Sequence, residues 1–303
     1  MDSMLLNGPE LLLAALRGAT PVLLVLLGEL ISQRAGIINL GVEGQMLLGA
    51  CVGFAVAAIS QNPWLGLLAG ALAGLALSMV HGLLVLGIGI NQLASGLAVL
   101  LLGSGLSAFY GIPYVGQQAP SLHSPFPETF GILARLTPTV WMAILLSLLI
   151  GIWLYRTRTG LSWRAVGENP ALARLAGLPV RRIQLAGILI GGLLSGLGGA
   201  ALSVDYTHGW VEGMTAGRGL VAVGLVIVAR WNPWLALPVA LLFGGPEALA
   251  LRMQAAGIPV SAYLLAMLPY VMTLIVLLLS YWRMRQEAGG MPGGLRAVFS
   301  GAQ

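Results

Sequence analysis

The chain consists largely of apolar runs of about 20 residues, the length that an α-helix needs to cross a lipid bilayer. Hydrophobic residues make up 58% of its 303 residues and charged residues only 8%, and the mean hydropathy is +0.91. Backbone polar groups have no water partners in lipid, so such runs are expected to be helical. We predict an all-α, polytopic membrane bundle with about nine spans (8–10), some of them discontinuous helices, in a single domain over residues 1–303. The predicted spans are 11–32, 38–60, 64–88, 92–110, 138–155, 183–204, 218–231, 234–255 and 261–282.

Residues 156–182 form the one long polar interruption of this chain, with six arginines and one acid. A second arginine-rich segment, residues 283–303, follows the last predicted span. Because basic segments stay on the cytoplasmic side of a membrane, both the loop and the C-terminal tail are predicted to be cytoplasmic. Five spans precede the loop and four follow it, which places the N-terminus outside.

A short helix is predicted inside this loop, from Pro170 to Ala176. Asn169 is its N-cap, Pro170 suits its first position, and Gly177 ends it. At about 1.5 Å per residue the helix is only ~10 Å long, too short to be stable alone in water. We therefore expect it to be held against another part of this protein or a partner.

The fifteen basic residues are all arginines. Without a lysine, the chain cannot build the phosphate-binding loop of an ATPase or a Schiff base with a substrate carbonyl. Any ATP would be used by a partner subunit, and we expect no cofactor in this chain. The net charge of +5 does not indicate nucleic-acid binding, because the loop and the tail account for all of its positive excess.

The sequence offers little for an enzyme. His81, His123 and His208 are far apart, and the absence of a His-Glu-x-x-His pair argues against a zinc site. Ser104 stands between glycines without a base to activate it, and the single Cys51 lies in an apolar run. We predict neither catalytic residues nor a metal site.

Six polar residues within or beside the spans are candidates for lining a solute pathway: Asn39, Glu43, Asn91, Gln92, Ser95 and Glu247. A charge at membrane depth is costly, so Glu43 is expected to face water or a hydrogen-bonding partner. Asn39 and Glu43 are four residues apart and would share a helix face. They would line the pathway or form a structural network that holds a broken helix against its neighbours. Asn91 and Ser95 would contact a solute, or cap and cross-link helices.

Glu247 follows a Gly-Gly-Pro run at residues 244–246. This pattern indicates a helix break of the kind that lines transport sites, with helix packing as the alternative explanation. Residues 62–67 and 232–237 each open a span with Asn-Pro-Trp. The repetition fits an inverted repeat, or simply a favourable helix start at a membrane interface.

Five stretches resemble, in this order, the permease subunits of bacterial ATP-binding-cassette (ABC) importers for branched-chain amino acids, ribose and nucleosides. They are QRAGIINLGVEGQMLLGA, INQLASGLAVLLLGSGL, GENPALARLAGLPV with GILIGGLLSGLGGA, RGLVAVGLVIVARWNPWLALPVALLFG and LPYVMTLIVLLL. The short N-terminus before AGIINLGVEG and the ARWNPW segment most resemble nucleoside-importer permeases. The chain departs from such relatives at Ala98, Val99 and Leu100, where they often carry polar residues.

The resemblance implies a non-catalytic permease of the bacterial inner membrane that works by alternating access. Its coupling helix would contact the ATPase through Gly167, Glu168, Asn169, Pro170, Ala173, Arg174 and Gly177. The expected partners are an ABC ATPase subunit, a second permease that is paralogous or identical, an extracytoplasmic solute-binding protein and membrane lipid. The solute would be a nucleoside, with branched-chain amino acids or sugars as alternatives.

The alternative of a different class is an ion-coupled secondary transporter or channel that needs no ATPase. It would require an intramembrane ion site, for which Glu43, Asp205 and Glu247 are the only acids at hand. A membrane enzyme would require a reactive pair of side chains, which the sequence does not offer.

Overall fold

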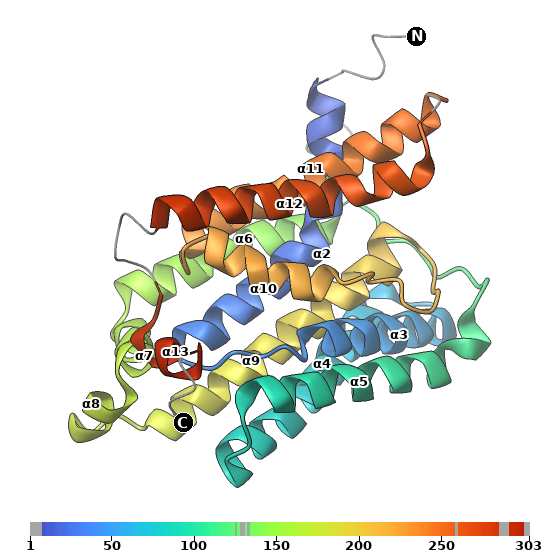
Figure 1. Cartoon of the computed structure of the whole chain (residues 1–303). Coiled ribbons are helices and arrows are strands. Elements are labelled where there is room, and N and C mark those ends of the chain that lie inside the picture. The colour runs from blue at the N-terminus through green and yellow to red at the C-terminus, as the bar shows by residue number, and fades with distance from the viewer. Residues whose placement is uncertain are drawn as a thin grey trace.

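The computed structural model describes residues 8–124, 126–127, 131, 134–257, 260–284 and 291–299. Within these residues there is no strand, and eight helical segments are long and apolar enough to cross a membrane (Figure 1). This confirms the predicted all-α membrane bundle. The eight segments are α2 (Gly8–Arg34), α3 (Val42–Ser60), α4 with the π-helical turn η1 (Pro63–Ile88), α5 with η2 (Gln92–Tyr114), α6 (Pro138–Arg156), α9 with η4 (Val180–Tyr206), η5 with α11 (Pro233–Ala255) and α12 (Ala262–Met284). The shorter helices are α7 (Arg158–Glu168), α8 (Pro170–Leu175), α10 (Arg218–Val228) and α13 (Gly293–Phe299).

Helix α2 lies at the centre of the bundle (Figure 1). Every residue from Gly18 to Gln33 is buried, and the helix packs against α9, α11, α10 and α6. A helix that is apolar on all sides is expected to be enclosed by others. Because α2 contacts so many neighbours, a movement at either of its ends would reach most of the bundle.

Helices α3, α4 and α9 approach one another closely through glycines. A Cβ atom at Gly49 would lie 2.4 Å from the carbonyl oxygen of Gly196, and one at Gly199 would lie 1.9 Å from that of Met46. In lipid the hydrophobic effect does not drive helices together, because lipid tails are as apolar as the side chains. Helices associate there by close van der Waals packing, which small residues allow. The glycines therefore set how closely these three helices can pack.

This packing predicts that Gly199→Leu strongly destabilises the chain, since the added side chain would collide with the backbone of Met46 and Ala50. We expect a cost of about 3 kcal/mol or more, at the upper end for overpacking. Gly105→Leu is the matched control, because a Cβ at Gly105 meets nothing within 4 Å. Melting temperature and monodispersity in detergent would measure both; equal behaviour of the two variants would contradict the packing argument.

The seventh predicted span, residues 218–231, is not a full-length helix. Helix α10 ends at Val228, and its 11 residues cover about 16 Å, half the thickness of the hydrocarbon core. The chain returns from Tyr206 at one end of the bundle to Trp231 at the other, so non-helical residues 207–217 make the first part of this crossing. The discontinuous character expected of some spans is thus found here.

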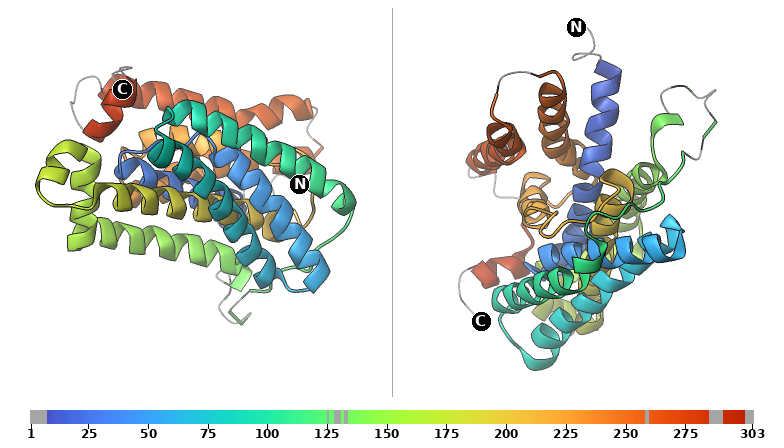
Figure 2. Two further views of the ribbon diagram at one scale, coloured as in Figure 1. Left: turned by 90° about the horizontal axis from the view of Figure 1, so that it is seen from below. Right: turned by 90° about the vertical axis from the view of Figure 1, so that its right-hand side faces the viewer.

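Helices α7, α8 and α13 gather at one end of the bundle (Figures 1 and 2). The Asn-Pro-Trp segments are helix starts: the side chain of Asn62 accepts a hydrogen bond from the Trp64 N–H at 3.0 Å, and that of Asn232 accepts one from the Trp234 N–H at 3.1 Å. A local cap is sufficient to explain both segments.

Candidate functional site

Buried polar side chains surround the irregular segment 35–41 between α2 and α3. The backbone N–H of Asn39 donates to Glu29 Oε1 at 3.1 Å, and its side-chain Nδ2 donates to Gln45 Oε1 at 3.1 Å. Asn39 Oδ1 in turn accepts from the Gly41 N–H at 2.9 Å. Asn39 is 1% exposed, and its hydrogen bonds stabilise the non-helical segment between α2 and α3.

Of the polar residues at the start of α5, Asn91 caps the helix, and Gln92 and Ser95 bind other segments. Gln92 Oε1 accepts a hydrogen bond from the Ile38 N–H at 2.9 Å and thereby ties α5 to segment 35–41. Ser95 is buried and its hydroxyl lies 2.9 Å from His81 Nδ1 of α4. Asn91 is exposed, and its side chain caps α5 by accepting from the Leu93 N–H at 2.8 Å. These contacts match the capping and cross-linking alternative.

Glu43 binds the beginning of α10, which lies far away in the sequence. Its carboxylate accepts hydrogen bonds from the Thr215 hydroxyl at 2.5 Å, the Gly217 N–H at 2.8 Å and the Gly219 N–H at 2.7 Å. The first N–H groups of a helix lack partners and form the positive end of its dipole, so a carboxylate is well placed there. The predicted shared helix face with Asn39 is wrong, because α3 begins only after residue 41.

The contacts of Glu43 correspond to one of the two alternatives for this residue, a structural network that holds a broken helix. Only 6% of Glu43 is exposed, and both of its carboxylate oxygens already accept hydrogen bonds. Glu43 thus holds the interrupted crossing of residues 207–231 against α3.

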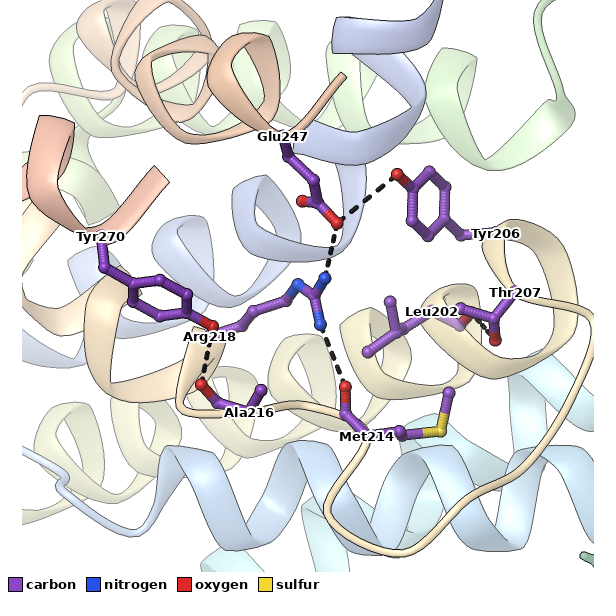
Figure 3. A network of polar contacts seen from close by, with 8 residues as sticks. All are labelled: Leu202, Tyr206, Thr207, Met214, Ala216, Arg218, Glu247 and Tyr270. Atoms are coloured by element: carbon purple, nitrogen blue, oxygen red, sulfur yellow. Dashed lines mark hydrogen bonds and ion pairs between the residues drawn. The ribbon is translucent and has the colours of Figure 1, made fainter. Parts of the chain in front are cut away.

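Glu247 of α11 forms an ion pair with Arg218, the first residue of α10 (Figure 3). Arg218 Nη2 lies 2.5 Å from Glu247 Oε1, and the two side chains are only 15% and 12% exposed. Arg218 Nη1 also donates to the Met214 carbonyl at 3.0 Å. The Tyr206 hydroxyl reaches the same Glu247 oxygen at 3.5 Å. The pair therefore joins α10, α11 and the end of η4.

The helix break expected beside Glu247 is absent, because α11 continues from Ala236 to Ala255 with Pro246 inside it. Gly244 serves packing instead: a Cβ there would lie 2.4 Å from the carbonyl oxygen of Ala15 in α2. The missing N–H of Pro246 leaves one helical hydrogen bond unmade, which a helix enclosed by neighbours tolerates. The helix break predicted at residues 244–246 is therefore wrong.

Two cavities meet at the Arg218–Glu247 pair. The larger has a volume of about 830 Å³ and is lined also by Arg17, Tyr206, His208 and Arg252. The smaller, of about 250 Å³, is bounded by Arg218 and Glu247 together with Phe243, Leu265 and Tyr270, among others. Volumes of this order accommodate a small solute. The pair is part of the wall of both.

Each of the three acids considered for an ion site has protein partners. Asp205 accepts hydrogen bonds from the hydroxyls of Thr137, at 2.6 Å, and Thr139. Glu43 and Glu247 both bind the start of α10, Glu43 through Thr215 and the N–H groups of Gly217 and Gly219 and Glu247 through Arg218. In the part of the chain that the structure describes, no three metal-ligating side chains form a group.

The loop at residues 156–182 folds into a helical hairpin of α7 and α8. The predicted short helix is confirmed: α8 spans Pro170–Leu175, Asn169 Oδ1 accepts from the Leu172 N–H at 3.0 Å, and Gly177 takes a left-handed conformation with φ of 82°. The prediction from sequence did not include α7 (Arg158–Glu168), a helix in which polar residues alternate with few apolar ones.

The residues expected to contact an ATPase differ in their exposure. Gly167 and Ala173 are buried, and a Cβ at Gly167 would lie 2.1 Å from the carbonyl oxygen of Arg34. They shape the hairpin and fix it to α2 rather than face outwards. The exposed members are Glu168, Asn169, Arg174 and Gly177, with Pro170 half-buried.

Two leucines on α8 are the residues that sequence reasoning missed. Leu172 is 61% exposed and Leu175 is 85% exposed, at the tip of the hairpin. They lie three residues apart and are therefore neighbours on the surface of this short helix. The available signal was that both are apolar residues within the short helix that the caps at Asn169 and Gly177 define.

The C-terminal segment covers the other side of the hairpin. Leu295 of α13 is fully buried, and a Cβ at Gly294 would lie 2.9 Å from the Gly167 carbonyl oxygen. The Gly293 N–H faces the Glu168 carboxylate, with 3.4 Å between Gly293 N and Glu168 Oε2. Residues 291–299 of the predicted tail therefore lie at the same end as α7 and α8. The other tail residues from 285 onwards lie outside the described residues, as do residues 1–7.

Comparison with known proteins gives a family match over most of the chain. The model of the permease component of branched-chain amino acid transport systems matches residues 11–278. A putative glucose ABC transporter permease of Haloferax volcanii, TsgC13, is 42% identical over 259 residues, which cover 80% of this chain and 78% of that protein.

Two further relatives are described as nucleoside permeases. The nucleoside ABC transporter permease NupC of Lactococcus lactis is 32% identical over 86% of this chain and 89% of its own length. The guanosine ABC transporter permease NupQ of Bacillus subtilis is 31% identical over 87% of this chain and 89% of its own. No solved structure matches the chain significantly.

Proposed function

The chain belongs to the family of permease components of branched-chain amino acid transport systems, a family of ABC transporter permeases, and from this premise we propose that it carries nucleosides inward across a bacterial inner membrane. It does so as a non-catalytic subunit. Its partners are an ABC ATPase at the α7–α8 end, a second permease, and a solute-binding protein at the opposite end. The α7–α8 hairpin and the C-terminal segment then lie in the cytoplasm.

The observation that carries this proposal is the exposed apolar tip of the α7–α8 hairpin. Leu172 and Leu175 are exposed three residues apart, and the caps at Asn169 and Gly177 fix the helix that presents them, so a partner that covered this helix would remove both side chains from water. The chain lacks lysine for a phosphate-binding loop, so a partner with its own nucleotide site fits this surface.

The hairpin is joined rigidly to the central helix. Trp163 of α7 donates from Nε1 to the Ile31 carbonyl at 3.0 Å, and Gly167 lies against Arg34. Arg34 in turn donates from Nε to the Trp231 carbonyl at 2.8 Å, just after α10. A push on α8 would therefore move the ends of α2 and α10 together. Such a movement is the mechanical input that alternating access requires.

Nucleosides are proposed over sugars because two relatives described as nucleoside or guanosine permeases align over 86–87% of this chain. The relative described as a glucose permease is the more similar of the three, at 42% identity, and makes a sugar the second candidate. Both solutes are small, polar and uncharged, and the two cavities at Arg218 and Glu247 are large enough for either.

The test is transport by the assembled complex in proteoliposomes. The chain is co-expressed with the ABC ATPase and second permease of its transport system, purified, and supplied with the solute-binding protein. Uptake of labelled guanosine that requires ATP supports the proposal, whereas ATP-dependent uptake of glucose alone would favour the sugar alternative. Uptake that continues with a hydrolysis-deficient ATPase and follows an ion gradient would overturn it in favour of a secondary transporter.

A further inference from the structure

The Arg218–Glu247 pair lines two adjoining cavities. Both side chains, with Leu251, contribute to the walls of the larger and of the smaller cavity. The pair lies at the beginning of α10, where the non-helical part of the crossing ends (Figure 3). Tyr206 flanks it from η4 and Tyr270 from α12, where the Tyr270 hydroxyl donates to the Ala216 carbonyl at 2.7 Å. A solute that moves from one cavity to the other would pass Arg218 and Glu247.

Three buried polar atoms at this place have no hydrogen-bond partner among the described residues. They are Glu247 Oε2, Arg218 Nε and Arg252 Nη1. One is an acceptor and two are donors, so the site offers both kinds of group at once. Buried polar atoms normally find a partner, so three unpartnered atoms in one place need an explanation, and a polar solute bound there would supply the missing partners.

We propose that the Arg218–Glu247 pair is both the partition of the pathway and its recognition element, for an uncharged solute with a hydrogen-bond donor and an acceptor side by side. The inference rests on the proposed transport function and names the solute chemistry of the same site. A nucleobase edge has this arrangement, and so have adjacent hydroxyls of a sugar or ribose. Such a solute replaces Arg218 as the donor to Glu247 and replaces Glu247 as the acceptor for Arg218.

Separating Arg218 from Glu247 costs free energy. A charge that loses its partner in a dry environment is strongly disfavoured, so the pair opens only when the solute satisfies both partners. An anion would bind Arg218 and leave Glu247 facing a like charge, and a cation would do the reverse. Arg17, His208 and Arg252 line only the larger cavity, where they attract acceptor groups before the solute reaches the partition.

The contribution of Arg218 is directional as well as electrostatic. Its Nη1 is already bound to the Met214 carbonyl and its Nη2 to Glu247, which fixes the plane of the guanidinium. A planar group held in this way selects solutes by the geometry of their acceptors, which a lysine ammonium does not do. Specificity is therefore expected to depend on the guanidinium and not on the positive charge alone.

The experiment measures uptake and solute-stimulated ATP hydrolysis by the reconstituted complex carrying Glu247→Gln or Arg218→Lys in this chain. We expect both to raise the guanosine concentration for half-maximal transport by about 10-fold or more, with maximal ATP hydrolysis changed far less, because hydrogen bonds to charged groups are lost from solute binding. Glu10→Gln is the control for removing one carboxylate, since Glu10 is exposed and distant in sequence. Monodispersity and melting temperature establish that each variant is folded.

Competition experiments distinguish the two sources of the shared chemistry. A guanosine methylated on its base edge fails to compete if the base binds the pair, and a 2′,3′-dideoxynucleoside fails if adjacent hydroxyls do. Guanosine monophosphate transported better than guanosine would overturn the proposal, and so would unchanged half-maximal concentrations in both variants. If Glu247→Gln transports normally while a change at Leu175 uncouples transport, the permease function stands and the recognition role falls.

Discussion

Leu175→Asp should uncouple the assembled transporter: solute no longer stimulates ATP hydrolysis, and ATP-dependent uptake is lost. Leu175 is 85% exposed at the tip of the α7–α8 hairpin, so the substitution leaves the packing of the chain intact. If an ATPase covers this leucine, an aspartate buries an uncompensated charge in the contact. Loss of an apolar anchor of this kind typically costs about 2 kcal/mol or more of binding free energy.

The measurement is co-purification of the ATPase with the permease, together with ATP hydrolysis with and without solute. Leu175→Met is the matched control, because it keeps an apolar side chain of similar volume and should retain coupling. Leu172→Asp, at the second exposed leucine, should act in the same direction. The coupling assignment also expects Glu168 and Arg174 variants to reduce stimulation. Full coupling in Leu175→Asp and Leu172→Asp would show that the ATPase binds elsewhere.

Glu43→Ala should destabilise the chain more than any other single removal of a carboxylate among the described acids. It leaves the Thr215 hydroxyl and the N–H groups of Gly217 and Gly219 without an acceptor at the start of α10. A buried donor without a partner costs about 1–3 kcal/mol, so the loss is on the order of 3 kcal/mol or more. Melting temperature in detergent would record it.

Glu10→Ala is the control for this prediction, because the Glu10–Arg135 pair is exposed, at 48% and 63% of the side chains. An exposed ion pair is worth about 0–1 kcal/mol. Glu43→Gln keeps one acceptor oxygen and should be intermediate. If Glu43→Gln is as stable as the unmodified chain but transports poorly, Glu43 lines the pathway and the structural explanation fails.

Features that depend on neighbours in the sequence could be predicted without the structure. The apolar runs defined eight of the nine crossings as long helices, since a backbone in lipid must satisfy its own hydrogen bonds within the span. The cap at Asn169 and the stop at Gly177 defined α8, because both act within a few residues. The same local reasoning gave a wrong prediction at the Gly-Gly-Pro run before Glu247. Helix α11 is continuous there, and Gly244 packs closely against α2.

The partners of the buried polar residues were decided by the tertiary structure alone. Glu43 and Gly217 are separated by 174 positions, and Arg218 pairs with Glu247 across two helices. The spacing of residues in the sequence shows which of them share a helix face. It does not show which residues of another helix a side chain contacts, because that depends on how the helices pack. The sequence therefore determined the membrane bundle, the family and the capped helix of the loop. Only the tertiary structure decided that Glu43 holds α10 and that Arg218 and Glu247 line two adjoining cavities, because these contacts join segments that are far apart in the sequence.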